Sequence, residues 1–371
     1  MPERATSQRT ASEEGVPRYW LVGEMTGEVL RAGLVDSDGR VVAGQAQPLP
    51  EGSPREAVGL LAEMILALAS SQERGDAYLP ALGLAVDGYL EPATSRLTLE
   101  PSSASRALRP GTSRRGWARV DLIPLLGERL AQSGYDLSRP AAIRRGRADR
   151  KQPHPLPIHL FPRLHCLAAG EAWVGRARGK SDLVYLSIGE QIKAAILVGG
   201  HPLTGTKGQA GSVGWLSLSE VLRAEYQKVG CLTAEAGGSA YPRRSLEEWN
   251  GQPDSILGGV LASDPATVDI ARIFQAARGG DPLARQVIRS VCQWLGRAVA
   301  NLLVVLDPAL ILLGGEVGPL LKPFFEEIHA EAERWVPPGM KRGWRLAAPQ
   351  ISAEASLIGA AHLLSLRHPS S

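Results

Sequence analysis

The chain has 371 residues, enough for two domains that each bury a hydrophobic core. Apolar residues make up 44% of it and charged residues 21%, an ordinary composition that argues against a disordered chain and against a membrane protein. The net charge of +3 is too small to indicate a nucleic-acid partner by itself, and three cysteines without a CxxC pair argue against a disulfide framework.

The first quarter of the chain predicts the start of an α/β domain. Residues 1–17 are polar and lack an apolar segment, so we expect a disordered tail that is neither a secretory signal nor a membrane anchor, and a cytoplasmic protein. Residues 20–36 and 41–47 have the pattern of hairpin-linked strands, residues 54–71 have apolar side chains at helical spacing, and residues 81–89 predict a short buried strand. This order favours a sheet with covered faces.

The middle of the chain is less regular. Residues 120–132 predict a helix and residues 140–144 a brief strand, but prolines in residues 151–162 exclude regular structure for most of that segment. Within residues 139–151, six basic side chains accompany one acid, Asp149. We interpret this run as a solvated insertion, with an anion-binding or nucleic-acid patch as the alternative.

The second half predicts strands and helices at residues 183–188, 194–197, 267–278, 283–306 and 320–335. Asp281 and Pro282 precede the long fourth element in the manner of a helix N-cap followed by an early proline. Gly314 and Gly315 follow a buried apolar run, at the kind of turn where α/β folds bring the backbone close to a nucleotide. The fold class that we predict is α/β.

Residues 276–318 contain three motifs in sequence, of the form AxxGDxxA, LGxxxAN and DPxxILLGG. In this order and spacing they resemble the C-terminal domain of the ROK family (repressors, open reading frames and sugar kinases), and residues 356–364 resemble its last helix. The resemblance implies an actin-like ATPase (ribonuclease H-like) fold with two domains, an interdomain cleft, and a homodimer.

The resemblance also suggests how the chain is divided. We expect an N-terminal α/β domain at residues 18–158, with the basic and proline-rich insertion near 139–158, and a C-terminal α/β domain at residues 159–350. Residues 351–371 would form a helix that packs back on the N-terminal domain.

The family's catalytic motif, NDxNAAALGE, aligns with residues 162–171. Its last two residues persist as Gly170 and Glu171, but its catalytic aspartate is Arg163. A guanidinium has no acceptor site and stays protonated, so it cannot take the proton of a sugar hydroxyl. No catalytic residue is therefore intact at this position. We favour a surface ion pair at a helix start for Arg163, with an anionic ligand in the cleft as the alternative.

Both phosphate loops of the family are altered. DxGGT becomes residues 24–28, from Glu24 through Gly27, and GTGIGxG becomes a segment that keeps only Gly189 of its glycines. Such loops need glycine so that backbone N–H groups can reach phosphate oxygens. With Gly314 and Gly315, which the family places beside adenosine, these residues form a remnant of a nucleotide site. We expect no ATP or Mg²⁺ unless the kinase alternative below holds.

The sugar-site and zinc motifs of the family are degraded as well. Gly211 persists, but the sugar-binding Glu is Ser212 and the His is Trp215; with Glu171, these are our candidates for ligand binding. The zinc motif CxCGxxGC keeps one cysteine, and its positions are now Ala224, Tyr226, Gln227 and Cys231. One thiolate cannot hold a tetrahedral structural zinc, so we expect no metal.

Three functions remain open. The first is a pseudokinase that binds a sugar or sugar phosphate or acts as a regulatory protein. The second is an active ATP-dependent kinase for a hexose or N-acetylated amino sugar, with Asp149 or Glu24 as a relocated base. The third is an interaction protein in which Trp215 and Arg163 close the cleft. The 17 residues before the first strand are too few for a helix-turn-helix, so we expect no DNA binding by that route and no membrane partner.

Overall fold

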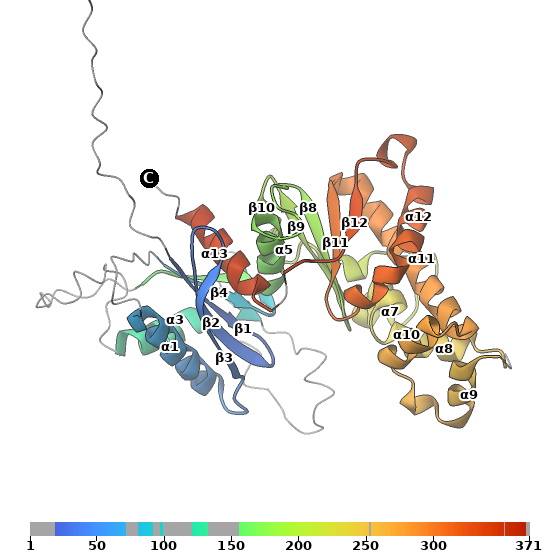
Figure 1. Cartoon of the computed structure of the whole chain (residues 1–371), viewed down its shortest axis with the longest axis horizontal. Coiled ribbons are helices and arrows are strands. Elements are labelled where there is room, and N and C mark those ends of the chain that lie inside the picture. The colour runs from blue at the N-terminus through green and yellow to red at the C-terminus, as the bar shows by residue number, and fades with distance from the viewer. Residues whose placement is uncertain are drawn as a thin grey trace, which may run out of the picture.

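A computed structural model describes residues 19–71, 81–91, 97–98, 121–132, 156–251, 254–351 and 353–368. The expected tail at residues 1–17, the brief strand at 140–144, the basic run at 139–151 and Asp149 lie outside these ranges. The described chain forms two five-stranded sheets on either side of helices α5 and α13, with a layer of further helices on the outer face of each sheet (Figure 1).

The N-terminal sheet has the strand order β3-β2-β1-β4-β7. Its strands are β1 (Trp20–Met25), β2 (Val29–Val35), β3 (Val41–Pro48), β4 (Leu82–Val86) and β7 (Ile158–Pro162), and a separate pair is formed by β5 (Tyr89–Leu90) and β6 (Leu97–Thr98). Strands β1, β2 and β3 are antiparallel neighbours, whereas β1, β4 and β7 run parallel. The carboxyl ends of β1, β4 and β7 therefore meet at one edge of the sheet.

Strand β7 takes up the last five residues of the proline-rich segment 151–162 and pairs with β4, which is compatible with the expectation that prolines exclude regular structure from most of that segment. Pro162 is accommodated since β7 is an edge strand, where a missing N–H costs no ladder bond.

Helices cover both faces of this sheet. On one face lie α1 (Pro54–Ser71), at the predicted bounds, and α3 (Leu122–Gln132). On the other face lie α5 (Arg163–Trp173) and α13 (Ala355–Arg367). The two helices approach closely, because a Cβ on Gly170 would stand 2.7 Å from the carbonyl oxygen of Ala355 and one on Gly359 would stand 1.7 Å from that of Cys166. Glycine is thus required in both family motifs by helix packing.

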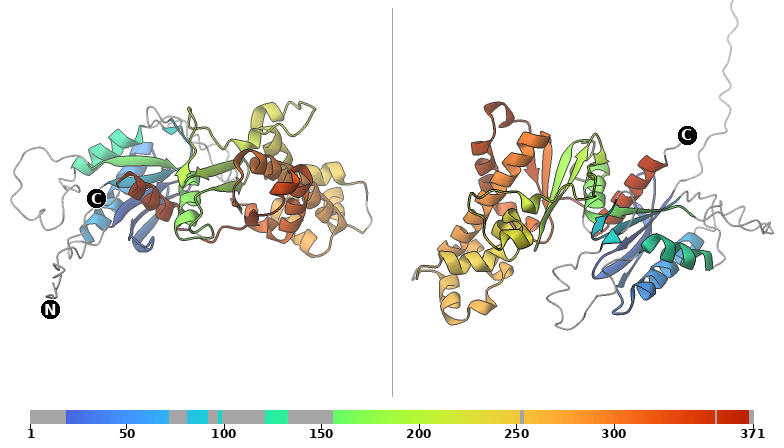
Figure 2. Two further views of the ribbon diagram at one scale, coloured as in Figure 1. Left: turned by 90° about the horizontal axis from the view of Figure 1, so that it is seen from above. Right: turned by 180° about the vertical axis from the view of Figure 1, so that it is seen from behind.

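The C-terminal sheet has the order β10-β9-β8-β11-β12. Its strands are β8 (Leu183–Ile188), β9 (Ile192–Val198), β10 (His201–Pro202), β11 (Leu310–Gly314) and β12 (Arg345–Ala347). Helix α5 packs against this sheet too, through Leu164 and Ala168. It therefore lies between the two sheets, as the further views in Figure 2 show.

The outer helices of this half build the largest apolar core, around α11. Their bounds are α6 (Tyr226–Val229), α7 (Cys231–Ala236), α8 (Ala240–Glu248), α9 (Ile256–Ser263), α10 (Ile270–Arg278), α11 (Pro282–Leu306) and α12 (Phe325–Trp335), with 3-10 turns η2 (Val213–Trp215), η3 (Pro265–Thr267), η4 (Gly318–Phe324) and η5 (Pro338–Met340). The predicted cap is confirmed, because the Asp281 carboxylate accepts from Ala284 N at 2.9 Å. Within the described ranges, no helix is both long enough and apolar enough to cross a bilayer.

Candidate functional site in the cleft between the sheets

A cleft of about 420 Å³ lies where β4, β7 and β8 end, between the two sheets. Open α/β sheets place ligands at the carboxyl ends of their parallel strands, so this is the expected position for a site. Five charged side chains line the cleft: Asp87, Arg163, Glu190, Lys193 and Glu225.

Glu24 on β1 is the buried anion behind this cleft, with none of its surface exposed. Its Oε1 accepts hydrogen bonds from Arg163 Nε at 2.6 Å and from Ser356 Oγ at 2.7 Å. Its Oε2 pairs with the guanidinium of Arg31 on the neighbouring strand β2. Both carboxylate oxygens thus have partners, which is what keeps a charged group acceptable in a buried position.

Arg163 reaches Glu24 because of strand register. Glu24 pairs with Ala85 of β4, and the next residue of β4, Val86, pairs with Pro162 at the end of β7. The first residue of α5 therefore starts beside Glu24. The predicted ion pair of Arg163 at a helix start is confirmed, but it joins a buried carboxylate and is not a surface contact.

The surroundings of Arg163 favour its charged form. Burial lowers its pKa, but the carboxylates of Asp87 and Glu24 outweigh that effect, so the pKa is raised above its ordinary value. The side chain is 35% exposed and remains part of the cleft wall.

Asp87 is a site residue that the sequence interpretation missed. It follows β4 directly, and its Oδ1 lies 3.9 Å from Arg163 Nη1. Burial raises the pKa of Asp87, and Glu24 adds to this, while Arg163, Lys193 and a hydrogen bond from the Gly27 backbone lower it. The available signal was its position, an acid at the carboxyl end of a buried strand and followed by glycine.

Lys193 projects from β9 into the same cleft. Burial lowers its pKa to about 8, with Asp87 acting in the opposite direction. At neutral pH the cleft therefore presents two cations, Arg163 and Lys193, and three acidic side chains, Asp87, Glu190 and Glu225.

The two altered phosphate loops lie in different surroundings. Glu28 is exposed and is not among the residues that line the cleft. Glu190 does line it, and its carboxylate lies against Gly238, where an added Cβ would be 2.9 Å from Oε2. The N–H of Gly189 donates to the carbonyl of Gln191 at 3.2 Å, within its own turn. One remnant loop therefore carries a negative charge into the cleft.

The paired glycines after β11 have a packing explanation. A Cβ on Gly314 would stand 2.3 Å from the Tyr185 hydroxyl, and Gly315 has φ +79° and would bring a Cβ to 2.5 Å from the Ile188 carbonyl oxygen. Both positions need glycine whether or not a nucleotide binds.

The residues predicted to contact a sugar are not gathered in the cleft. Gly211 has φ +87° and presses on β9, where a Cβ would lie 1.9 Å from the Ala194 carbonyl oxygen. The Ser212 hydroxyl donates to Gln209 O within its own turn at 2.8 Å. Trp215 is 55% exposed and so does not close the cleft. None of the three belongs to the described lining.

Glu171 is also outside that lining and fastens backbone segments. It is fully buried, and it accepts from Arg176 N at 2.7 Å, Gln350 N at 2.8 Å and Ile351 N at 2.6 Å. The carboxylate therefore ties the end of α5 to the segment that leads into α13.

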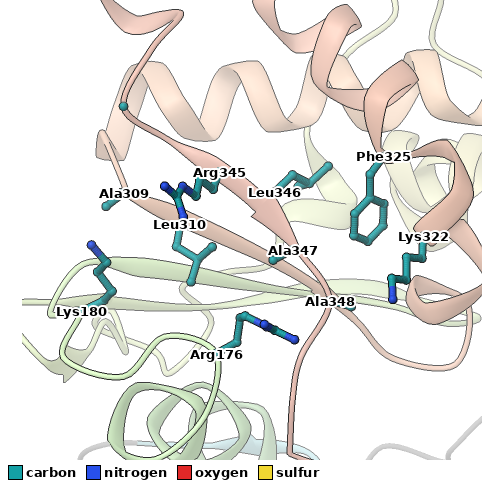
Figure 3. A pocket seen from close by; sticks show the side chains of 11 residues that line it. Arg176, Lys180, Ala309, Leu310, Lys322, Phe325, Arg345, Leu346, Ala347 and Ala348 are labelled. Carbon is teal, nitrogen blue, oxygen red and sulfur yellow. The ribbon is translucent and has the colours of Figure 1, made fainter.

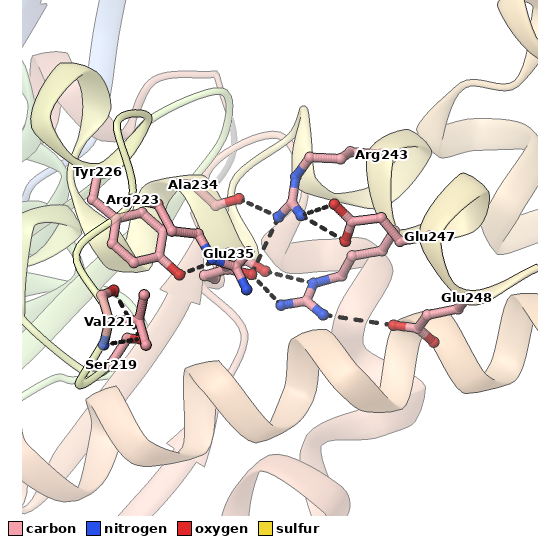
Figure 4. Close-up of polar contacts among 10 residues, drawn as sticks. Ser219, Val221, Arg223, Tyr226, Ala234, Glu235, Arg243, Glu247 and Glu248 are labelled. Carbon is pink, nitrogen blue, oxygen red and sulfur yellow. Dashed lines mark hydrogen bonds and ion pairs between the residues drawn. The ribbon is translucent and has the colours of Figure 1, made fainter.

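A cluster of charged side chains lies next to the segment aligned with the zinc motif and includes Tyr226 from that segment (Figure 4). At its centre Glu235 of α7 is 2% exposed and accepts from Tyr226 Oη at 2.5 Å, Arg223 Nη1 at 3.1 Å and Arg243 Nη2 at 3.2 Å, and it also pairs with Arg244. Arg243 and Arg244 each contact a further acid, Glu247 and Glu248. We call these seven residues the Glu235 cluster. Cys231 is buried beside it, and within the described ranges no group of three or more His, Cys, Asp or Glu could hold a metal.

Comparison with known proteins agrees with this architecture. The ROK family model matches residues 152–366. A glucokinase of Thermotoga maritima is 23% identical over 95% of this chain and 99% of its own length. A ROK hexokinase of Thermus thermophilus superposes with a TM-score of 0.69 at 21% identity, covering 94% of this chain and 99% of its own.

A ROK family transcriptional regulator, a homologue of the E. coli MLC protein, superposes with the same TM-score, 0.69, at 19% identity. It covers 93% of this chain and 77% of its own. These structures confirm the predicted actin-like α/β fold.

Proposed function

Because the chain belongs to the ROK family, we propose that it is a member that has lost catalysis and uses the cleft to bind a small ligand, a sugar or a sugar phosphate. The observation that carries this proposal is the ion pair between Glu24 and Arg163. These are the two positions at which the family motifs have an aspartate, one in the first phosphate loop and one as the catalytic base. Here the two side chains satisfy each other and leave no proton acceptor at position 163.

The charges of the cleft support a sugar over a nucleotide. Asp87, Glu190 and Glu225 line it, and like charges at about 4 Å cost roughly 1 to 4 kcal/mol, so a triphosphate would meet repulsion. Carboxylates and cations together suit a ligand with many hydroxyl groups, which donate to the first and accept from the second. Arg163 and Lys193 can also hold a single phosphate.

Two measurements test this proposal. We expect thermal shift and titration calorimetry with hexoses, N-acetylated amino sugars and their 6-phosphates to give saturable binding. Asp87→Asn should weaken that binding, while Glu28→Gln, which changes an exposed acid outside the cleft lining, should leave it unchanged. A coupled assay should detect no ADP release with any of these sugars. The absence of binding by every sugar would contradict the proposal.

A working sugar kinase is the second candidate, and Asp87 is the observation that favours it. This carboxylate lines the cleft, and its raised pKa brings it closer to the operating range of a general base. Glu24 is a poorer candidate because it is fully buried and both of its oxygens have partners. ADP release that falls about 10²- to 10⁴-fold in Asp87→Asn would establish the kinase and overturn the non-catalytic proposal.

A further inference from the structure

A second cavity lies away from the cleft, along the edge strand β12 of the C-terminal sheet (Figure 3). Its volume is about 600 Å³, within the range of small-molecule sites. It begins at Ala309 and Leu310, at the amino end of β11, whereas the cleft lies at the carboxyl end of the neighbouring strand β8. The two cavities share no lining residue.

Four cations surround this cavity, and they come from three separate segments. Arg176 and Lys180 follow α5, Lys322 lies in η4, and Arg345 begins β12. Figure 3 shows these side chains spaced around the surface formed by β11 and β12. No Asp or Glu is among the eleven lining residues. Within the described part of the chain, none of the four cations forms an ion pair.

This arrangement is unfavourable for the protein alone. The four cations are exposed, and a cavity of this volume is about 10 Å across, a little more than the Debye length of about 8 Å at physiological ionic strength, so salt screens much of their mutual repulsion and the part that remains is modest. Elsewhere in the molecule exposed arginines do find acids, as Arg334 does with Glu331 at 2.9 Å. An anion with several charged groups would relieve the repulsion.

The floor of the cavity restricts the kind of anion. Leu310, Leu346 and Ala347 supply apolar surface, and Phe325 adds an aromatic ring at one side. A concave site with an apolar floor and charged groups at its margin suits a compact organic molecule better than an extended acidic chain. We propose that this cavity binds a small metabolite that carries two or more phosphate groups, at a site separate from the cleft.

The test is titration calorimetry of the full chain with inorganic tripolyphosphate at physiological salt. We expect one saturable site. Lys322→Gln and Arg345→Gln should each weaken binding about tenfold, because each removes one charge-assisted hydrogen bond to phosphate. Arg342→Gln is the matched control, since Arg342 is exposed and lies three residues before Arg345 but does not line the cavity, and it should leave the affinity unchanged.

The variant Lys193→Gln distinguishes this cavity from the cleft. Poly-glutamate, an extended polyanion, distinguishes it from a surface that attracts any polyanion. Lys193→Gln removes a cation of the cleft and should not alter tripolyphosphate affinity. Loss of binding in Lys193→Gln would assign the anion to the cleft and overturn the inference, whatever becomes of the sugar proposal. Equal weakening by Arg342→Gln and Arg345→Gln, tighter binding of poly-glutamate than of tripolyphosphate, or no saturable heat would each overturn it too.

Discussion

Two buried carboxylates, Glu24 and Glu235, both pair with arginines. They differ in how far along the sequence their partners lie. Glu24 binds Arg31 on β2, 7 positions away, and also Arg163 on α5 and Ser356 on α13, which lie 139 and 332 positions away. Glu235 binds residues that lie between 8 and 12 positions from it in the sequence. One ion-pair group joins distant parts of the chain at the cleft, and the other fastens neighbouring helices at its margin.

The comparison shows two ways in which a family motif can be lost without loss of the fold. At the cleft, the residues at two motif positions, Glu24 and Arg163, pair with each other. Next to the segment aligned with the zinc motif, the residues form an ion-pair cluster around Glu235. In both places buried charge is retained, and because buried charge is tolerated only with partners, both groups should be sensitive to the removal of one member.

The largest expected effect comes from restoring the family's residue at position 163. Arg163→Asp removes a cation from Glu24 and places a like charge beside it, so the free energy of unfolding should fall by about 3 to 5 kcal/mol. Urea denaturation measures this loss. Arg163→Lys keeps the charge and is the control, with a loss of about 1 kcal/mol from the missing guanidinium geometry. A stable Arg163→Asp protein would show that Glu24 does not depend on Arg163.

Removal of Glu235, the central acid of the Glu235 cluster, should lower the free energy of unfolding by a smaller amount. Glu235→Gln leaves three arginines without their shared partner, but Arg223 is 55% exposed and can reach water, and Arg243 keeps Glu247. We expect the free energy of unfolding to fall by about 2 to 3 kcal/mol.

The control for Glu235 is Glu247→Gln, which removes a half-exposed partner of the same Arg243. That change should cost less than about 1 kcal/mol in urea denaturation. If Glu235→Gln and Glu247→Gln lowered the free energy of unfolding equally, the Glu235 cluster would act as a surface ion pair and not as a buried one.

The stability that the Glu235 cluster contributes should depend on pH in the acid range. Burial raises the pKa of Glu235, but hydrogen bonding from Tyr226 and the charges of Arg244 and Arg243 outweigh it, so the pKa lies below its ordinary value of 4.5. A carboxyl whose pKa is lower in the folded state contributes stability that is complete above 4.5 and is lost as pH falls through the folded value. The melting temperature of the wild type should therefore fall below pH 4.5 more steeply than that of Glu235→Gln, a difference that calorimetry across this range detects.

The smallest effect should come from metal removal. If the Glu235 cluster holds the segment together without zinc, EDTA should leave the melting temperature unchanged and a colorimetric zinc assay should find no metal. Cys231→Ala should cost only about 1 kcal/mol, the loss of a small apolar contact. A chelator-dependent melting temperature would show that a metal is bound after all.

The extent to which the sequence predicted this structure varied with the range of the interactions. Helix α1 appears at its predicted residues, and Asp281 caps α11 as its neighbours indicated, because both depend on contacts within a few residues. Helix α10 starts at Ile270 and not at 267, since the Asp269 side chain caps it by accepting from Arg272 N. Asp87 escaped notice because its local signal, an acid at the end of a buried strand, does not reveal that Arg163 and Lys193 lie beside it.

The sequence by itself determined the family and the α/β class, and it put Arg163 where the family motif has an aspartate, since each depends on residue identity and short spacing. Only the tertiary structure decided which groups Arg163 meets. Glu24 lies 139 positions away in the chain, and the two are neighbours because β1, β4 and β7 run parallel and end at one edge. Contacts between the ends of adjacent parallel strands depend on strand order and register, which no local pattern specifies.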